Sequence, residues 1–372
     1  MILKPVDIDK EKLIFDETQH EYTWAYYFKQ YANVLNYIIS ISVEKHYRLN
    51  CMHRAVMFIF RHTVELFLKM SLDAKGIRVQ NTHKLSELIN ELGEKFSQEF
   101  VDRLEILMPR GEGDNFKYLE NKEGQRFYQN NEILDVLPSI FSFITDDNVK
   151  KMAIFPVFLD LNDKILRGEW RFYTREVYTL GQIKTQYDSL ISELLSAIKN
   201  DELRIEEVYL PLLFLIRHSL ELAFKGNALE LYKIFVKKKQ QDNCHKSHSL
   251  VALFNIVDFY VKKVMDDKDM LPDSDVIRKD IEKYLPMSEN LCTTIHKMDC
   301  NSFSFRFPID RDGNSIKIPF ERNLLCDSVS TYQEADAFIS LSIGFLKYNN
   351  NFFLKKYPKL FDDYFAEQYG LH

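Results

Sequence analysis

Four polar residues that could act together on a phosphate group occur twice in this chain. The two sets are Arg61, His62, Glu65 and Lys69 in the first copy, and Arg217, His218, Glu221 and Lys225 in the second. Each residue of the second set follows its counterpart by 156 positions. Arg and Lys bind phosphates, and His transfers protons near neutral pH. The residue types therefore fit RNA cleavage or nucleotide binding.

The similarity between the two copies extends further along the chain. Thr82-His83-Lys84-Leu85 corresponds to Ser247-His248-Ser249-Leu250. Phe116-Lys117-Tyr118, followed by Gly124, corresponds to Phe305-Arg306-Phe307, followed by Gly313. The three anchors keep their order while the distance between the copies grows. This pattern indicates an internal duplication with insertions in the second copy.

The first polar set shares one side of the helix predicted over residues 52–73. At about 100° per residue, its four members fall within an arc of about 100°. The rest of this helix is almost entirely apolar. A helix that is apolar on nearly every side is buried, and its polar stripe then needs partners or a ligand.

Two main interpretations of the stripes are open, and a protein interface is a third. In the structural one, Glu65 pairs with Arg61 and Lys69 on adjacent turns, and His83 reaches back from the next helix to complete the network. The second copy would repeat this network with Glu221, Arg217, Lys225 and His248. In the functional one, the Arg and Lys residues hold phosphates and the His residues transfer protons.

The periodicity of apolar residues predicts a mostly α protein of two tandem helical bundles with small β-hairpins. The expected parts are an N-terminal segment (1–21), a first unit (22–150), a connector with extended segments (151–178), a second unit (179–348) and a tail (349–372). We expect first-unit helices over 22–49, 52–73, 83–106 (with Thr82 as its N-cap) and 131–144, and second-unit helices over 180–199, 205–232, 247–265, 275–298 and 331–348. Hairpins are expected over 114–128 and 303–320, and extended segments over 154–159 and 170–173.

The composition of the 372 residues, with 46% apolar and 28% charged residues, is typical of a globular protein. A formal net charge of −6 gives no global attraction to nucleic acid. The first 12 residues lack the apolar core of a secretory signal, and no apolar run approaches the length of about 20 residues that spans a bilayer. Five Cys without a CxxC pair favour reduced thiols, and hence a cytoplasmic location.

One stretch of the second copy is locally basic. It contains Lys233, Lys237, Lys238, Lys239, His245, Lys246 and His248, opposed only by Asp242. Such a stretch either guides a nucleic-acid strand along its phosphates or is a solvated loop.

Two groups of Cys and His are spaced like partial metal sites. Cys292, His296 and Cys300 lie at i, i+4 and i+8, but one straight helix cannot bring all three to a tetrahedral ion. Cys244 and His245 with His248 form the other group. We therefore expect neither a metal nor a cofactor.

The repeated Arg-His…Glu-Leu…Lys helix, the following His-x-Leu helix and the Phe-Arg-Phe hairpin resemble the HEPN superfamily. This resemblance implies two tandem HEPN-like helical bundles in a pseudo-two-fold arrangement, so that a cleft formed elsewhere by a dimer arises within one chain. It also implies RNA engagement in a bacterial or phage stress or defence system, with metal-independent endoribonuclease activity as one form of that function. The alternative is a non-catalytic protein-interaction or nucleotide-sensing module in which the stripes are structural.

The resemblance assigns roles to the repeated residues. The catalytic candidates are Arg61, His62, Glu65, Arg217, His218 and Glu221. The substrate-binding candidates are Lys69, His83, Lys225, His248, Lys237, Lys238, Lys239 and Lys246. The expected partners are RNA and a regulatory protein, with no membrane, and the chain would act as a monomeric pseudo-dimer or a homodimer.

The sequence departs from HEPN ribonucleases at one point. Their catalytic Arg and His are four to six residues apart, whereas the repeated pairs here are adjacent. Arg48 with His53 and Arg78 with His83 have the required spacing. Arg48 corresponds to Arg204, but His53 corresponds to Tyr209, so a symmetric pair of catalytic motifs is absent.

Overall fold

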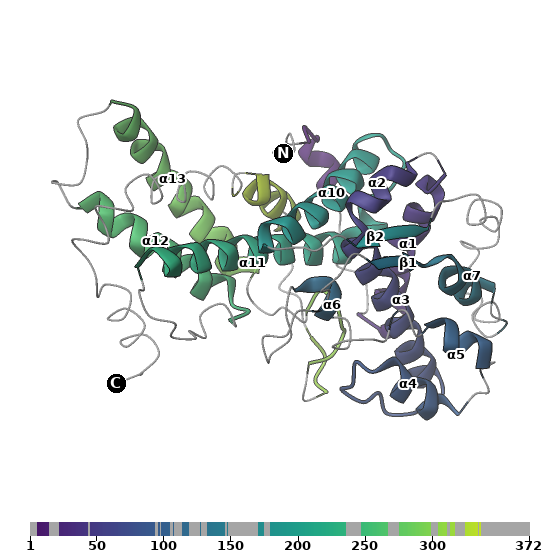
Figure 1. Cartoon of the computed structure of the whole chain (residues 1–372). Helices are drawn as coiled ribbons and strands as arrows, with labels where there is room; N and C mark the ends of the chain where they lie inside the picture. Colours follow the sequence, from purple (N-terminus) through teal and green to yellow (C-terminus); the bar gives the residue numbers. More distant parts are fainter. Residues whose placement is uncertain are drawn as a thin grey trace. The chain divides into compact units, whose positions relative to one another are not determined.

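The computed structural model describes residues 6–14, 22–43, 45–93, 96, 98–104, 107, 114–118, 127, 132–145, 147, 170–174, 179–235, 247–266, 275–298, 304–310, 313–316, 324–333 and 335. These residues are mostly helical, which confirms the prediction of a mostly α protein (Figure 1). The chain divides into two compact units. The first comprises Met1–Leu215 and Phe303–Asn323, and the second comprises Ile216–Ser302 and Leu324–His372.

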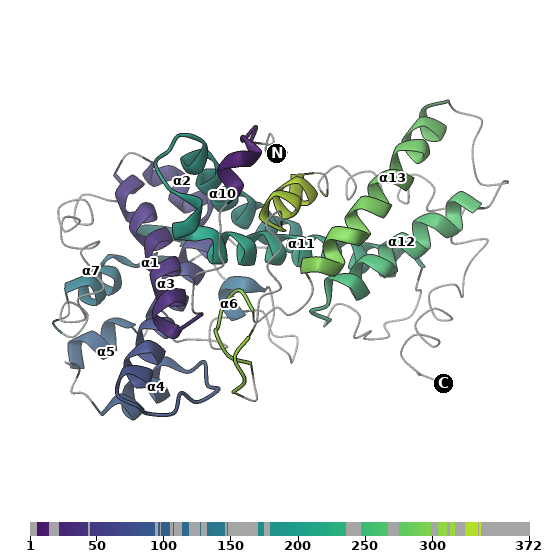
Figure 2. The same cartoon turned by 180° about the vertical axis from the view of Figure 1, so that it is seen from behind.

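The first unit is built around helix α3 (His53–Ala74), which carries the first stripe. Of its residues, His53 to Leu72 are all buried. Helix α1 (Trp24–Ile41) lies beside it in both views (Figures 1 and 2), and Thr23 caps α1 by accepting a hydrogen bond from the Tyr26 N–H. The predicted helix over 52–73 is therefore confirmed, and it is the most deeply buried element described.

Several predicted helices are interrupted. The helix expected over 22–49 consists of α1 and a separate short helix, α2 (His46–Cys51). The helix expected over 83–106 consists of α4 (Leu85–Leu92) and α5 (Gln98–Leu104). Gly93 ends α4 with a φ of 63°, a left-handed conformation that favours glycine. Thr82 is not the N-cap of α4, because Lys84 occupies that position and Thr82 accepts from the Lys84 N–H.

The predicted hairpin over 114–128 is wrong where the structure describes it. Residues Asp114–Lys117 form the short helix α6, with Asp114 in its first turn, where a negative charge favours the helix. The helix expected over 131–144 begins only at Leu137, as α7 (Leu137–Thr145). The residues before it form strand β1 (Glu132–Asp135). Such short apolar runs do not distinguish strand from helix by their periodicity.

Strand β1 pairs antiparallel with β2 (Arg171–Thr174), which confirms the extended segment predicted at 170–173. In this register Leu134 faces Phe172, which is fully buried, while Ile133 faces Tyr173 on the exposed side. The segment expected over 154–159 lies outside the described residues.

The first unit also contains helix α10 (Leu180–Lys199) and the start of helix α11 (Ile205–Phe235), which belong to the second repeat. Helix α10 starts with a capping box at Thr179 and Gln182, as predicted for residues 180–199. Helix α11 agrees closely with the predicted 205–232, and the boundary between the two units falls within it.

Equivalent residues of the two repeats contact each other reciprocally within the first unit. The Arg54 N–H donates to Gln186 Oε1 at 2.9 Å, and the Leu210 N–H donates to Gln30 Oε1 at 3.3 Å. Gln186 follows Gln30, and Leu210 follows Arg54, by the repeat offset of 156. Likewise, Phe58 stacks on Phe214, its own equivalent, with ring centroids 4.6 Å apart.

Gln30 and Gln186 form hydrogen bonds with backbone groups at places where the regular helical hydrogen bonds are interrupted. Pro211 lies inside α11 and has no N–H, and the Glu207 carbonyl one turn earlier accepts instead from Asn33 Nδ2 at 3.0 Å. The Gln30 amide is inserted beside this point, where it donates to the Glu206 carbonyl and accepts from Leu210. At the corresponding place in the first repeat, the helix is broken between α2 and α3, where Gln186 accepts from Arg54.

The second unit contains the remainder of α11, with α12 (Leu250–Asp266) and α13 (Asp275–Met298). These agree with the helices predicted over 247–265 and 275–298. Residues 324–333 are also helical, earlier than the predicted 331–348, of which most lies outside the described residues. None of the described helices combines the length and apolar character needed to cross a membrane.

Candidate functional site

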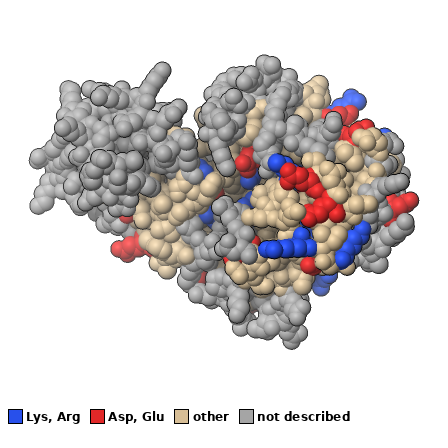
Figure 3. Space-filling view, turned by 90° about the horizontal axis from the view of Figure 1, so that it is seen from below, with Lys and Arg blue, Asp and Glu red and all other residues tan. Residues whose placement is uncertain are grey.

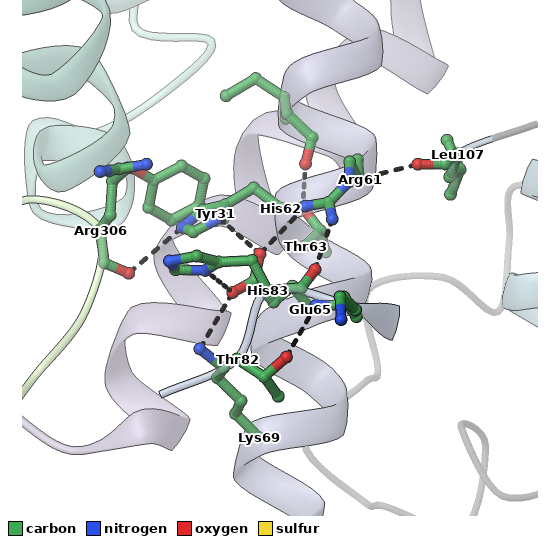
Figure 4. Close-up of polar contacts among 12 residues, drawn as sticks. Tyr31, Arg61, His62, Thr63, Glu65, Lys69, Thr82, His83, Leu107 and Arg306 are labelled. Atoms are coloured by element: carbon green, nitrogen blue, oxygen red, sulfur yellow. Dashed lines mark hydrogen bonds and ion pairs between the residues drawn. The ribbon is translucent and has the colours of Figure 1, made fainter. Parts of the chain in front are cut away.

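The carboxylate of Glu65 is the centre of the first stripe, and it is 1% exposed (Figure 4). Its Oε2 atom pairs with Arg61 Nη1 at 3.1 Å. Its Oε1 atom pairs with Lys69 Nζ at 3.0 Å and with His83 Nδ1 at 2.8 Å. The predicted pairing of Glu65 with its neighbours one turn away and with His83 is therefore confirmed.

Arg61 is enclosed by hydrogen-bond acceptors. Besides Glu65, its guanidinium donates to the Leu107 carbonyl at 3.2 Å and to the His83 carbonyl at 2.6 Å. Arg61 is 5% exposed. Its donors therefore hold the loop that precedes α4 against α3, and the guanidinium does not face solvent.

His62 is packed among aromatic rings. Its ring centroid lies 4.6 Å from that of Tyr31, 5.0 Å from Phe307 and 5.5 Å from Phe58. Nε2 donates to the Arg306 carbonyl at 3.2 Å, which sets the tautomer. Burial lowers the pKa of His62 to about 4, although the Glu65 carboxylate opposes this shift. His62 is therefore neutral at pH 7 and sealed from solvent.

The Lys69 ammonium has two kinds of partner. One is Glu65, and the other is the face of Phe307, whose ring centroid lies 4.4 Å from Nζ. Trp24 adds a second ring at 5.5 Å. Cation–π contacts of this kind strengthen when the cation is desolvated, and Lys69 is only 2% exposed.

The ion pairs of the second stripe use the same atoms as those of the first. Glu221 Oε2 pairs with Arg217 Nη1 at 3.1 Å, and Oε1 pairs with Lys225 Nζ at 2.8 Å and His248 Nδ1 at 2.9 Å. Arg217 also donates to the His248 carbonyl. His218 Nδ1 lies 3.9 Å from Glu221, as His62 lies 3.8 Å from Glu65.

The two buried glutamates are ionised. Burial alone would raise their pKa values, but the charges and hydrogen bonds around them outweigh it. The charge of Lys69 and the hydrogen bond and charge of His83 hold the pKa of Glu65 well below its usual value. Lys225, His248, His218 and Arg217 do the same for Glu221.

The charged side chains of the two networks are almost entirely buried. Arg61, Lys69, Arg217 and Lys225 are each 5% exposed or less. Only the histidines that close the networks reach solvent, with 32% of the His83 side chain and 58% of the His248 side chain exposed. In this arrangement the stripe cations are satisfied by protein groups and present no surface to a phosphate.

The other predicted site residues are placed only in part. Lys237, Lys238, Lys239 and Lys246 lie outside the described residues. His53 is buried, its Nδ1 bonds to the Asn50 carbonyl at 2.9 Å, and burial lowers its pKa to about 4.

The partial metal sites gain no further support from the described residues. Cys292 is half-buried and His296 exposed on α13. In the described part of the chain, no group of three or more His, Cys, Asp or Glu side chains is placed to hold a metal ion.

Sequence reasoning missed the residues that close the first network from outside the two helices. Phe307 and Arg306 come from a segment about 240 residues away, and the Leu107 carbonyl lies between α5 and α6 in the sequence. The recurrence of the aromatic-basic-aromatic motif was the signal that could have identified Phe307. No family model, curated protein or solved structure matches the chain.

Proposed function

We propose that the chain is a HEPN-like, RNA-engaging protein whose two Arg-His-Glu-Lys stripes stabilise the fold rather than cleave RNA. In this proposal the two repeats are tandem HEPN-like bundles related by a pseudo-two-fold axis. RNA is bound outside the stripes, through the basic stretch over residues 233–248.

The reciprocal contacts in the first unit support the pseudo-two-fold relationship. In a two-fold interface, a contact from i to j is accompanied by one from the equivalent of i to the equivalent of j. The hydrogen bonds of Arg54 with Gln186 and of Leu210 with Gln30 have this relationship. Near such an axis a residue meets its own equivalent, as Phe58 meets Phe214.

The burial of both stripes is the observation that carries the structural role. A cation that holds a phosphate must reach it, and Arg61 and Arg217 are 5% and 3% exposed. A general acid or base near neutral pH needs a matching pKa, and burial lowers that of His62 to about 4. A single copy of this network could be incidental, but the second copy repeats its pairings and nearly its distances.

RNA would then be held by exposed positive charge elsewhere. On the face shown in Figure 3, the described Lys and Arg side chains lie among Asp and Glu side chains and do not gather into one patch. The net charge of −6 also gives no general attraction. The stretch from Lys233 to His248 is the strongest local concentration of positive charge in the sequence, and it contains the insertion that only the second copy carries.

The test is binding and cleavage of a labelled single-stranded RNA at several salt concentrations. We expect the wild type to bind without cleaving, and its affinity to fall as salt rises. A Lys→Gln variant at Lys237, Lys238, Lys239 and Lys246 should bind at least about tenfold more weakly. Its salt dependence should be shallower, by about 0.7 in slope for each lost phosphate contact.

The matched control replaces four exposed lysines elsewhere, Lys29, Lys75, Lys84 and Lys199, and makes the same change in net charge. This control should keep most of the affinity. Equal losses in the two variants would show that the basic stretch is not the site. Absence of RNA binding by the wild type would favour the protein-interaction alternative, and cleavage lost in a folded His62→Gln variant would overturn the structural role of the stripes.

A further inference from the structure

Three consecutive backbone carbonyls of the segment Ser304–Phe307 are held by side chains of the first repeat. Tyr27 Oη donates to the Ser304 carbonyl, Tyr31 Oη to the Phe305 carbonyl at 2.9 Å, and His62 Nε2 to the Arg306 carbonyl at 3.2 Å. Tyr27 and Tyr31 are one turn apart on α1, and His62 follows on α3. Figure 4 shows Tyr31 and His62 on neighbouring helices, with the Arg306 carbonyl facing His62.

The next side chain of the segment, Phe307, is buried against side chains of α1, α3 and the residues before α4. The ring of Phe307 is 4% exposed and lies against Lys69, with Nζ 4.4 Å from its centroid. Its centroid is 5.0 Å from that of His62, 5.3 Å from His83 and 6.2 Å from Trp24. A cation above a ring face selects an aromatic side chain at this position over an aliphatic one.

Arg306, the residue before Phe307, makes cation–π contacts. The Arg306 guanidinium lies over the ring of Phe214, 5.5 Å from its centroid, and over Phe307 itself at 5.4 Å. The first repeat therefore contacts both the main-chain carbonyls of the turn Ser304–Arg306 and the side chains of Arg306 and Phe307. We call the side chains Trp24, Tyr27, Tyr31, His62, Lys69 and His83 the α1–α3 groove.

The segment that occupies the groove belongs to a small hairpin closed on itself. The Ile316 N–H donates to the Pro308 carbonyl at 2.8 Å, and the Asp310 N–H donates to the Asn314 carbonyl at 2.9 Å. Gly313 forms the exposed tip with a φ of 86°. The hairpin comes from the second repeat, whereas the groove comes from the first. A segment of the second repeat is therefore bound by side chains of the first.

The first repeat makes the corresponding contact in the opposite direction. Tyr187, the equivalent of Tyr31, donates to the carbonyl of Phe116, the equivalent of Phe305, at 3.3 Å. Both contacts therefore place a carbonyl of an aromatic-basic-aromatic segment on a tyrosine of the other repeat. Phe116 lies in helix α6 and Phe305 in a turn, so the feature common to both directions is the hydrogen bond from the tyrosine hydroxyl to the carbonyl.

We infer that the α1–α3 groove is a binding site for a peptide that presents the aromatic-basic-aromatic sequence in a turn, and that Ser304–Phe307 is its resident, exchangeable ligand. A segment of the same chemistry on another protein competes for the groove once the resident segment is weakened. Exchange of the segment would also uncover Lys69 and His62. The inference does not depend on RNA binding.

The test uses a fluorescein-labelled peptide with the sequence of residues 304–309, followed by fluorescence anisotropy. The full chain carrying Phe307→Ala should bind this peptide saturably. The wild type should bind it at least about tenfold more weakly, because its own segment competes at an effective concentration on the order of millimolar. A peptide with Ala at the position of Phe307 should not bind the variant.

Adding Tyr27→Phe and Tyr31→Phe to the Phe307→Ala variant should weaken peptide binding about tenfold. The matched control is Tyr173→Phe, an exposed tyrosine on β2 outside the groove, and it should leave binding unchanged. Should Phe307→Ala not fold, Phe307→Leu removes the ring while keeping apolar volume. A folded variant that does not bind, equal binding by wild type and variant, or binding of the Ala peptide would each overturn the inference.

Discussion

Glu65 and Glu221 distribute their partners over the same carboxylate atoms. In each residue, Oε2 faces the arginine four positions earlier at 3.1 Å. In each, Oε1 pairs with both the lysine four positions later and the histidine that precedes the next helix. The same geometry therefore occurs in both repeats.

Removing either carboxylate charge should therefore destabilise the protein strongly. Glu65→Gln or Glu221→Gln leaves an arginine and a lysine buried without their counter-ion, which costs about 3–5 kcal/mol when one partner of a buried pair is lost. Urea unfolding measures the free energy. Glu87→Gln, at an exposed pair with Lys84, is the control and should unfold at the wild-type midpoint. A small effect at Glu65 would show that its network adds little.

Stability should fall as the pH is lowered from 6.5. Burial lowers the pKa of His53 and His62 to about 4, whereas the unfolded chain binds protons at these residues below the ordinary value of 6.5. Each residue then removes about 1.4 kcal/mol of stability per pH unit between these limits. Below pH 4.5 the loss continues, because Glu65 and Glu221 stay ionised in the fold but take up protons when unfolded.

The measurement is the free energy of unfolding at pH 7, 6 and 5. His62→Gln should make the decline between pH 6 and 5 shallower by about one proton, whereas His296→Gln, at an exposed site on α13, should leave it unchanged. A flat profile in the wild type would contradict the neutral, buried state of both histidines.

The two inserted glutamines should differ in their contribution. Gln30→Ala leaves both the Leu210 N–H and the Glu206 carbonyl without this partner, and should cost about 1–3 kcal/mol. Gln186→Ala removes one bond, to the Arg54 N–H, and should cost less. Urea unfolding of both variants beside Gln98→Ala, whose amide bonds to Asp102 on the surface, tests this order. The reverse order would contradict the role of Gln30 beside Pro211.

The closing histidines offer a comparison at different burial. His83 and His248 make the same bond to a buried glutamate, but 32% and 58% of their side chains are exposed. Water can replace the more exposed one. His83→Ala should therefore lower the thermal midpoint more than His248→Ala, by a loss of about 1–2 kcal/mol at His83. Equal shifts would show that exposure does not set the value of this bond.

Local periodicity was enough to predict the parts of the site that lie on one helix and the next. Arg61, Glu65 and Lys69 follow from the spacing of 3.6 residues per turn, and His83 follows from an antiparallel helix pair. The contacts of His62 with the Arg306 carbonyl and of Lys69 with Phe307 do not follow, because their partners are distant in sequence. Helix α6 and strand β1, of four residues each, are too short for periodicity to assign.

The bond between the Arg54 N–H and Gln186 spans 132 residues, and it has a consequence for the order of events during synthesis. The start of α3 leaves the ribosome long before Gln186 has been translated. Until then the Arg54 N–H lacks Gln186 as its acceptor and is left to water. The first repeat alone therefore cannot form this hydrogen bond at the break between α2 and α3. The first repeat therefore completes its folding only after the second has been synthesised. During this interval chaperones would have access to it.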